Sequence, residues 1–442
     1  MVKIEYLKTL TAARRKALLT RSAVDLSSAA ERTREIFSAL LADPAKELFR
    51  EYGPLKAELS LKDFLVSLAE LEQAEAAVSQ SLIGALNEAK ENIKKFHLSQ
   101  LERSMWLTEV APGLLAGRVT SPLERVGVYI PGGRASYPSS ALMNIIPAVC
   151  AGVREIIAVT PPGPQMTIRP EILTACRLSG ATKIYKLGGA WAVGCLAYGL
   201  AGLPKVDKIV GPGSTWVMAA KMAVYGQVDI DSPAGPSEGF IIADSSSEPA
   251  HLAWDFLAQL EHDPEASAIL ITDSEQTAAS VVNLVNQGSR KIDRAAIVGQ
   301  SLKNAAILVV DDLAEAFDFA NEYAPEHLEI VTSDPWSSLG RVKHAGSVFL
   351  GPNAPIAAGD YATGPNHVLP TGGSARAFSG LSVDAFLKKT TFQYLSPKAL
   401  ADVSGTVITL AESEGLTAHA ESVRVRVGAQ TKAAPTGQNV KK

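Results

Sequence analysis

Four histidines stand close to carboxylates in short polar segments of the chain. The sequence contains seven histidines in all, and these four are His262, His327, His367 and His419. Imidazoles beside carboxylates supply the ligands of a zinc site and the groups that transfer protons near neutral pH. A single such pair is also common in surface turns, so the chemical interpretation depends on the four segments occurring together.

The segment 357–373 joins Asp360 and His367 through a stretch rich in glycine and proline. These residues prevent a long helix or a central strand, so we expect a shaped loop. It follows the strand-like run 346–350, and loops in this position often carry ligand-binding or catalytic groups. A surface turn with a satisfied histidine is the alternative for this segment taken alone.

A second segment places Gln259 and His262 at the end of an expected helix that begins near Pro249. Residues three apart on a helix point to the same side, so one metal ion could bind the amide oxygen and the imidazole together. A structural zinc site would more often use several cysteines, and the three present are not placed for it.

Composition is that of a globular protein, with 442 residues, 47% hydrophobic and 20% charged. This length predicts at least two domains. The formal net charge of -4 gives no reason to expect nucleic acid or a membrane as partner, and favours small polar metabolites. The start of the chain lacks a signal-peptide core, and no stretch reaches membrane-spanning length. With three cysteines in apolar surroundings, we expect reduced thiols and a cytoplasmic protein.

Two series of short apolar runs alternate with helical segments from Arg125 onward. Such alternation predicts parallel sheets with helices on both faces, and a cleft near the carboxyl ends of the strands. The first series comprises 127–130, 155–160, 183–187 and 208–210. The second comprises 240–243, 268–272, 307–310, 328–331 and 348–350.

Glycine-rich turns follow several of these runs, at 131–133, 188–189 and 211–213. None has the Gly-x-Gly-x-x-Gly pattern of ordinary dinucleotide sites. Each leads toward a helix whose N-terminal amides could hold a phosphate, although plain turn chemistry explains the glycines equally well.

Six motifs in order give the chain a specific likeness, at 126–133, 234–238, 259–264, 324–329, 359–370 and 414–419. On these motifs the sequence from about 123 to 419 resembles the histidinol dehydrogenases. The resemblance implies a zinc-dependent, NAD-linked enzyme that oxidises L-histidinol through L-histidinal to L-histidine, the last step of histidine biosynthesis. It also implies a homodimer with shared active sites.

The resemblance further implies a role for each matching residue. Glu326 would activate water, and His327 would transfer protons in both oxidations. The implied zinc ligands, which also contact the substrate with His327, are Gln259, His262, Asp360 and His419. The remaining substrate positions are Ser237, His367 and Glu414. The implied cofactor contacts are Tyr129, Trp191 and Ser214.

The implied fold is α/β, with two incomplete Rossmann-like open parallel-sheet domains and helical N-terminal and C-terminal extensions. Residues 1–24 would form the N-terminal extension, 25–107 with 238–381 the catalytic zinc-binding domain, and 108–237 the cofactor-binding domain. Residues 382–427 would form a small helical or loop-like dimerisation domain that completes the partner's site, and 428–442 a disordered tail.

Three positions depart from the usual pattern of the family, namely Trp191, Ser214 and Ile356, which stand where glutamine, asparagine and an acidic residue are common. The first two concern the cofactor site, where the Trp191 ring could stack on the nucleotide. Alternatives to histidinol oxidation are a related sulfopropanediol dehydrogenase, a zinc-binding relative without turnover, and a metallohydrolase using Glu326. A carboxylate such as Glu414 disfavours a sulfonate substrate.

Overall fold

The computed structural model describes residues 1–21, 26–132, 137–232 and 235–433, with side chains as far as 428. The chain divides into two compact units. The first comprises Met1–Leu101 and Leu123–Phe386, and the second comprises Glu102–Pro122 and Leu387–Lys442.

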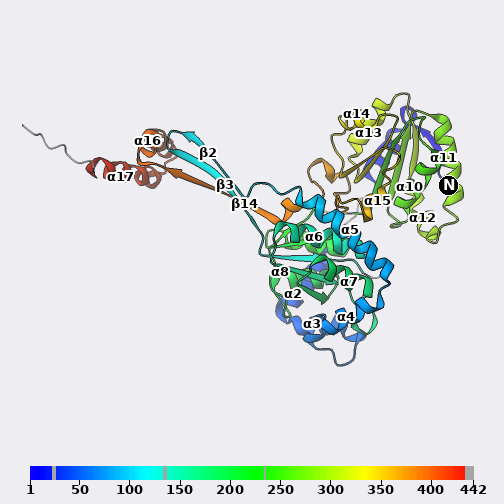
Figure 1. The fold of residues 1–442 in the computed structure, drawn as a ribbon, viewed down its shortest axis with the longest axis horizontal. Helices are drawn as coiled ribbons and strands as arrows, with labels where there is room; N and C mark the ends of the chain where they lie inside the picture. Colours follow the sequence, from blue (N-terminus) through cyan, green and yellow to red (C-terminus); the bar gives the residue numbers. More distant parts are fainter. Residues whose placement is uncertain (22–25, 133–136, 233–234, 434–442) are drawn as a thin grey trace, which may run out of the picture. The chain divides into compact units, whose positions relative to one another are not determined.

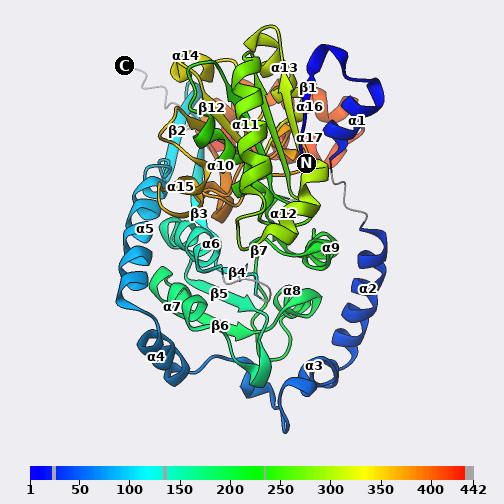
Figure 2. The ribbon, with the colours of Figure 1, turned by 90° about the vertical axis from the view of Figure 1, so that its right-hand side faces the viewer.

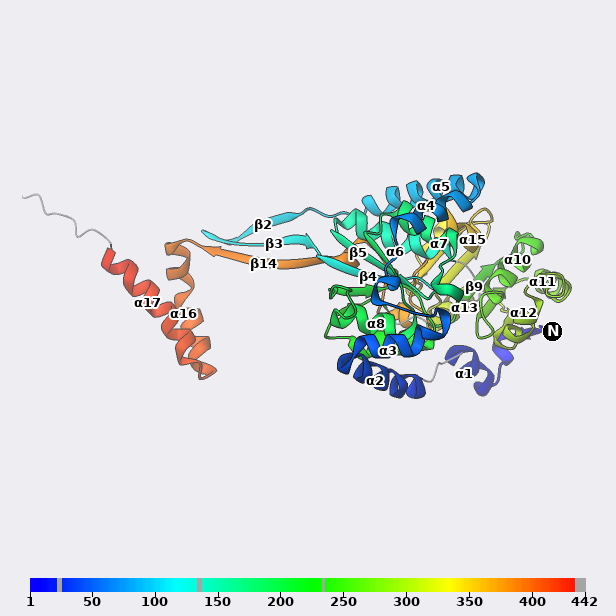
Figure 3. The same cartoon turned by 90° about the horizontal axis from the view of Figure 1, so that it is seen from below.

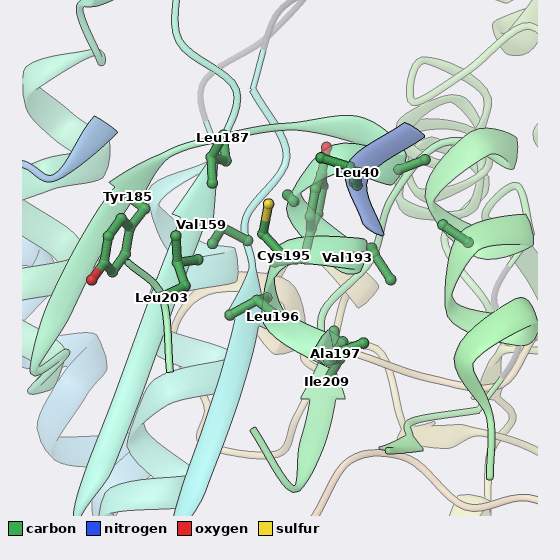
Figure 4. Packing of buried hydrophobic residues seen from close by; sticks show 14 of the residues in the cluster. Leu40, Val159, Tyr185, Leu187, Val193, Cys195, Leu196, Ala197, Leu203 and Ile209 are labelled. Carbon is green, nitrogen blue, oxygen red and sulfur yellow. The ribbon is translucent and has the colours of Figure 1, made fainter. Parts of the chain in front are cut away.

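A five-stranded parallel sheet forms one half of the first unit, in the order β6-β5-β4-β7-β8. Its strands are β4 (Arg125–Tyr129), β5 (Glu155–Thr160), β6 (Lys183–Lys186), β7 (Lys208–Val210) and β8 (Asp229–Ile230). Helices α6 (Pro138–Ala151) and α7 (Pro170–Ser179) cover one face, and α8 (Gly189–Tyr198) and α9 (Thr215–Val224) cover the other (Figure 2). Leu196 and Val193 of α8 pack with Val159 and Ile209 of the sheet in a buried core (Figure 4).

Helices from the N-terminal part of the chain form an outer layer on this half. They are α2 (Ser27–Ala42), α3 (Pro44–Tyr52), α4 (Leu68–Ala77) and α5 (Gln80–Leu98). Helix α2 packs on α8 and α9, α4 packs on α7, and α5 packs on α6. The domain division inferred from the sequence instead grouped 25–107 with 238–381.

A six-stranded parallel sheet forms the other half of the first unit, in the order β1-β11-β10-β9-β12-β13. Its strands are β1 (Ile4–Tyr6), β9 (Glu238–Ala243), β10 (Ser267–Thr272), β11 (Ala306–Val309), β12 (His327–Val331) and β13 (Ser347–Leu350). Helices α10 (Pro249–Leu260), α11 (Glu275–Gly288) and α12 (Ala295–Ser301) lie on one face (Figure 1). Helices α13 (Leu313–Tyr323) and α1 (Ala12–Thr20) pack on the other.

The two parallel sheets confirm the expected α/β class, and every strand segment of the two predicted series lies within or overlaps an observed strand. The edge strands β1 and β8 were not predicted. Strand β1 lies in the stretch expected to be an N-terminal extension, and it pairs with β11. The segment expected as a loop around Asp360 begins with a short helix, α15 (Ile356–Tyr361), after α14 (Pro335–Leu339).

The second unit is a three-stranded antiparallel sheet with a helical hairpin (Figure 3). It consists of β2 (Met105–Ala111), β3 (Leu114–Pro122), β14 (Leu387–Leu395), α16 (Pro397–Ser413) and α17 (Thr417–Ala433). The expectation that 382–427 is only helical or loop-like was wrong at β14, where Thr390, Thr391, Phe392 and Tyr394 favour a strand. Residues 428–433 continue α17 instead of forming a disordered tail, and 434–442 lie outside the described residues.

The cysteines agree with the expectation of free thiols. Cys176 and Cys195 are buried, Cys150 is partly buried, and all three are free. Within the described part of the chain, no helix combines the length and apolar character needed to cross a membrane.

Candidate active site

A pocket of about 600 Å³ lies between the two halves of the first unit. The half with the five-stranded sheet contributes Pro131, after β4, and residues 212–215, after β7. The other half contributes Ser237, the pair Glu326 and His327, and three residues after α10, namely His262, Asp263 and Glu265. The expectation of a cleft near the carboxyl ends of the strands is therefore correct for one sheet and wrong for the other. The pocket faces the carboxyl ends of the five-stranded sheet but the amino ends of the six-stranded sheet.

Glu326 and His327 stand at the start of β12, both buried, and one neighbouring residue holds both side chains. The backbone N–H of Glu238 donates to Glu326 Oε2 at 2.8 Å, and its backbone oxygen lies 3.1 Å from His327 Nδ1. Strands β9 and β12 are paired, which brings these residues together. If Nδ1–H donates to this carbonyl, His327 Nε2 carries the lone pair that faces the pocket.

His327 Nε2 has no hydrogen-bond partner within the protein. It lies 3.6 Å from Asp360 Oδ1, which is longer than a hydrogen bond. Burial lowers the pKa of His327, but the negative charges of Glu326 and Asp360 outweigh it and hold that pKa well above its ordinary value. The two carboxylates therefore favour the imidazolium, which is the form that His327 takes once it has accepted a proton.

Asp360 lies at the end of α15 among imidazoles. Burial raises its pKa, but the interactions with His327, His367 and His262 prevail and lower it. Asp360 is therefore an ionised carboxylate. The Nδ1 atom of His367 lies 2.8 Å from the backbone oxygen of Asp360, and burial lowers the pKa of His367. A neutral His367 leaves Nε2 available for a ligand.

Three of the four expected zinc ligands belong to this unit, and their donor atoms suit zinc. His262 and Asp360 line the pocket. Gln259 is 1% exposed, and its Oε1 atom has no hydrogen-bond partner, which is unusual for a buried amide oxygen. Metal coordination would satisfy this atom. No group of three or more His, Cys, Asp or Glu side chains placed to hold a metal occurs among the described residues.

A buried ion pair involves Glu238, the residue that contacts Glu326 and His327, and no pattern in the sequence indicated it. Arg21 Nε is 3.2 Å from Glu238 Oε1, and both side chains are 5% exposed. The guanidinium also lies 3.4 Å from the centre of the Tyr323 ring and donates to the backbone oxygen of Tyr323 at 2.5 Å. Arg21 thereby connects the N-terminal segment to the chain just before Glu326.

Two glycine turns of the half with the five-stranded sheet are held by hydrogen bonds to other parts of the chain. The backbone N–H of Gly189 donates to the Tyr129 hydroxyl at 3.1 Å, and that of Gly188 donates to the Tyr52 hydroxyl at 2.9 Å. Trp191 Nε1 donates to Glu47 Oε1 at 2.9 Å, and its ring packs edge-on against Tyr52. Tyr129 and Trp191 do not line the pocket, whereas Ser214 does.

The turn that carries Ser214 is fixed by a buried salt bridge between Lys221 and Asp231. Lys221 Nζ donates to the Gly211 oxygen at 3.0 Å, and the Gly211 N–H donates to Asp231 Oδ2 at 2.7 Å. Gly211 has φ +114, a left-handed conformation suited to glycine. Part of the 131–133 turn lies outside the described residues.

The remaining expected residues, Glu414 and His419, belong to the second unit. Glu414 caps the end of α16, and His419 lies in the first turn of α17. Both side chains are exposed. The first unit alone therefore brings together Ser237, Gln259, His262, Glu326, His327, Asp360 and His367.

Comparison with known proteins agrees with this arrangement. The sequence model of the histidinol dehydrogenase family matches residues 19–427. The histidinol dehydrogenase of Methanosarcina barkeri is 48% identical over 379 residues, covering 86% of this chain and 88% of that protein. That of Methanothermobacter thermautotrophicus is 45% identical over 411 residues, covering 93% and 96%. The crystal structure of histidinol dehydrogenase from Elizabethkingia anophelis superposes with a TM-score of 0.91 at 37% identity, covering 97% of this chain and 99% of that one. The chain belongs to the histidinol dehydrogenase family.

Proposed function

We propose that this chain oxidises L-histidinol through L-histidinal to L-histidine, as the last step of histidine biosynthesis, with two molecules of NAD and one zinc ion per subunit. The observation that carries the proposal is the pairing of Glu326 with His327 at the pocket, where His327 Nε2 has no protein partner. A base poised in this way suits the removal of a proton from an alcohol. Family membership gives the substrate.

The zinc ion would be held by Gln259, His262 and Asp360, with His419 of the partner subunit as the fourth ligand. The unpartnered Gln259 Oε1 atom supports this assignment. Bound zinc would hold the imidazole and amine of the substrate, and so orient the alcohol toward His327.

His327 would act as the proton acceptor in both oxidations. Its Nδ1–H donates to the Glu238 carbonyl, so Nε2 takes the hydroxyl proton of the alcohol, and later that of the aldehyde hydrate. The nearby carboxylates of Glu326 and Asp360 stabilise the imidazolium that results. Bound NAD would accept one hydride in each oxidation.

Glu326 would have a different task, because an aldehyde must be hydrated before it can lose a second hydride. Its Oε2 atom accepts the backbone N–H of Glu238, which fixes the carboxylate at the pocket. From this position it would take a proton from the water that attacks histidinal.

Ser237 and His367 line the pocket and would bind the substrate, together with Glu414. No lysine or arginine occurs among the described residues that line the pocket. Four acidic residues do line it, namely Asp263, Glu265, Glu326 and Asp360. This acidic lining favours an amino alcohol cation over a sulfonated diol, which would call for cationic partners.

The cofactor would lie along the 211–214 turn and the N-terminus of α9, where Ser214 lines the pocket. Helix N-terminal amides suit phosphate groups. Tyr129 would support this site indirectly through the Gly188–Gly189 turn. A stack of the Trp191 ring on the nucleotide would require the ring to leave Tyr52 and the indole N–H to leave Glu47.

The working molecule would be a homodimer in which the second unit completes the partner's site. In support, strand β2 has no buried side chain, and its Met105, Leu107 and Val110 are more than half exposed, at 54%, 52% and 64%. Such an apolar strand is typical of a surface that another protein covers. His419 and Glu414 are exposed on the same unit.

The experiment that tests the proposal compares candidate substrates of the purified, zinc-loaded protein. Absorbance of NADH should rise with L-histidinol and L-histidinal, and not with 2,3-dihydroxypropane-1-sulfonate. NADH formed from the sulfonated diol instead would favour the related sulfopropanediol reaction. No NADH from any substrate would favour a hydrolase or a zinc-binding protein without turnover.

A further inference from the structure

Helix α6 has an internal proline, Pro147, which leaves one backbone carbonyl without its usual partner. Proline has no N–H, so the carbonyl of Met143, four residues earlier, cannot make its helical hydrogen bond. Met143 is fully buried, and water therefore cannot replace that bond. The side-chain amide of Asn366 fills the gap, with Nδ2 donating to the Met143 oxygen at 2.6 Å.

Asn366 is itself 7% exposed, and each of its polar atoms has a partner. Oδ1 accepts from the backbone N–H of Val368 at 2.9 Å. Nδ2 also lies 3.4 Å from Nε2 of His97, a fully buried residue at the end of α5. His97 Nδ1 lies 2.7 Å from the Ile93 oxygen, so Nδ1 donates there and Nε2 accepts from Asn366.

The loop of residues 361–366 touches α5 at two further points. Asn92 Nδ2 donates to the Ala362 oxygen at 2.9 Å. Gly364 has φ +110, and a Cβ there would lie 2.9 Å from the Asn92 oxygen and 3.0 Å from Phe96 Cβ, so only glycine fits this approach. The loop is therefore docked on α6, which covers the five-stranded sheet, and on α5, which packs on α6.

The two ends of this loop are Asp360 and His367, which both line the pocket. They come from the chain that follows β13 of the six-stranded sheet, whereas α6 contributes Ser139 and Ser140 to the opposite wall. The bond from Asn366 to Met143 thus connects the substrate side of the pocket to the cofactor side.

We propose that Asn366 is a positioning residue, which uses the carbonyl released by Pro147 to hold Asp360 and His367 at the distance from the cofactor that the reaction needs. The inference rests on the proposed function for its catalytic consequence only. A purely structural role would predict a loss of stability and nothing more.

The test uses Asn366→Ala and Asn366→Asp in the full-length, zinc-loaded protein. The aspartate has nearly the same shape but turns a carboxylate oxygen toward the Met143 carbonyl, so it should be at least as damaging. Misplacement of reacting groups by about 1 Å can cost roughly 10²-fold, and we expect a fall of that order in kcat with histidinol. The zinc dissociation constant, measured by chelator competition, should rise about 10–100-fold because Asp360 moves. Hydrogen exchange of residues 360–368 should become faster.

Asn321→Ala is the matched control, since Asn321 also anchors a loop. It accepts from the backbone N–H of Lys343 at 2.7 Å and donates to the Arg341 oxygen at 2.9 Å, and it does not line the pocket. This variant should lower the unfolding midpoint while kcat, zinc affinity and exchange at 360–368 stay unchanged.

A second variant, Pro147→Ala, separates positioning from stability. It restores an N–H that can satisfy the Met143 carbonyl within α6. In this background, Asn366→Ala should cost less stability but just as much zinc affinity and turnover. Recovery of stability, zinc affinity and turnover together in the double variant would overturn the inference. Wild-type zinc affinity and a wild-type hydrogen-exchange rate at residues 360–368 in folded Asn366 variants would overturn it as well. Absence of histidinol oxidation by the wild type would instead refute the proposed function, and the exchange measurement would still decide the role of Asn366.

Discussion

Replacement of Arg21 by methionine removes the counter-charge of the buried Glu238 carboxyl, and its cost should depend on pH. The two groups are 3.2 Å apart. Burial raises the pKa of Glu238 from 4.5 to about 7, although Arg21 acts in the opposite direction. The wild-type carboxyl therefore becomes ionised near neutral pH.

A pKa that is raised on folding means that the folded carboxyl binds its proton more tightly than the unfolded one. Its contribution to the free energy of unfolding is complete below pH 4.5 and is lost as pH rises toward about 7, where it levels off. Each pH unit in this window costs about 1.4 kcal/mol. Without Arg21 the folded pKa of Glu238 rises further, so the loss continues above pH 7. The penalty of Arg21→Met should therefore be roughly 2 kcal/mol larger at pH 8.5 than at pH 6.

The assay is urea unfolding at pH 6.0, 7.0 and 8.5, followed by tryptophan fluorescence. In a Glu238→Gln background, Arg21→Met should cost the same at each pH, because no carboxyl is left to titrate. Arg15→Met is the matched control. Arg15 pairs with Glu322 at the surface and is 39% exposed, so its loss should cost less than about 1 kcal/mol at every pH. A penalty for Arg21→Met that does not grow with pH would refute the reasoning.

Further predictions concern the catalytic pair, the dimer and the docking of the loop. Glu326→Gln should keep most of the alcohol oxidation but lower the rate of histidinal oxidation by ~10²–10⁴-fold, whereas His327→Asn should lower both rates. The rates are measured with each substrate at saturating NAD and zinc, and equal losses for Glu326→Gln would contradict its role in hydration. A mixture of inactive Asp360→Ala and His419→Ala proteins should recover part of the activity when their subunits exchange, because each mixed dimer holds one intact site. No recovery despite verified exchange would place the site within one chain. Burial lowers the pKa of His97 below 6.5, so its contribution to stability is present above pH 6.5 and lost as pH falls below it. His97→Gln should remove this loss of stability at low pH, measured by urea unfolding. A dependence of stability on pH that stays the same in the variant would contradict the prediction.

The parallel strands could be predicted because each is a short, buried, apolar run bounded by turn residues. Strand β5, with Ile156, Ile157 and Val159 all buried, has no polar face to obscure its type. Strand β2 is entirely exposed or partly buried, and its mixture of Trp, Leu, Thr and Glu carries no such signal. Strand β14 contains two lysines near its start and follows an apolar segment that also suits a helix, so pairing with β3 decided its structure.

The candidate site residues were assigned from the sequence because each stands in a short motif, but the contacts that hold them could not be predicted. Glu238 acts through its backbone N–H and carbonyl, which every residue possesses. Arg21 reaches Tyr323 across a separation of 302 residues. The role of Asn366 requires the Met143 carbonyl, which Pro147 leaves without a helical partner in α6. Contacts between distant segments leave no local pattern in the sequence.

The orientation of the six-stranded sheet toward the pocket also could not be predicted from the sequence. The rule that ligands bind at carboxyl ends describes a single open sheet, whereas here two sheets share one pocket. Glu326 precedes β12, His327 is its first residue, and Ser237 precedes β9, so their position at the start of the strands was visible in the sequence. Only the structure brings these amino ends to the turns that follow the strands of the five-stranded sheet.

The stoichiometry of the complete reaction tests the central claim most directly. A limiting, known amount of L-histidinol would be given to the purified, zinc-loaded protein with excess NAD, and the NADH formed would be measured by absorbance together with the amino acid produced. The proposed function predicts two molecules of NADH and one molecule of L-histidine for each histidinol consumed. One NADH with accumulated histidinal, or consumption of histidinol without NADH, would contradict it.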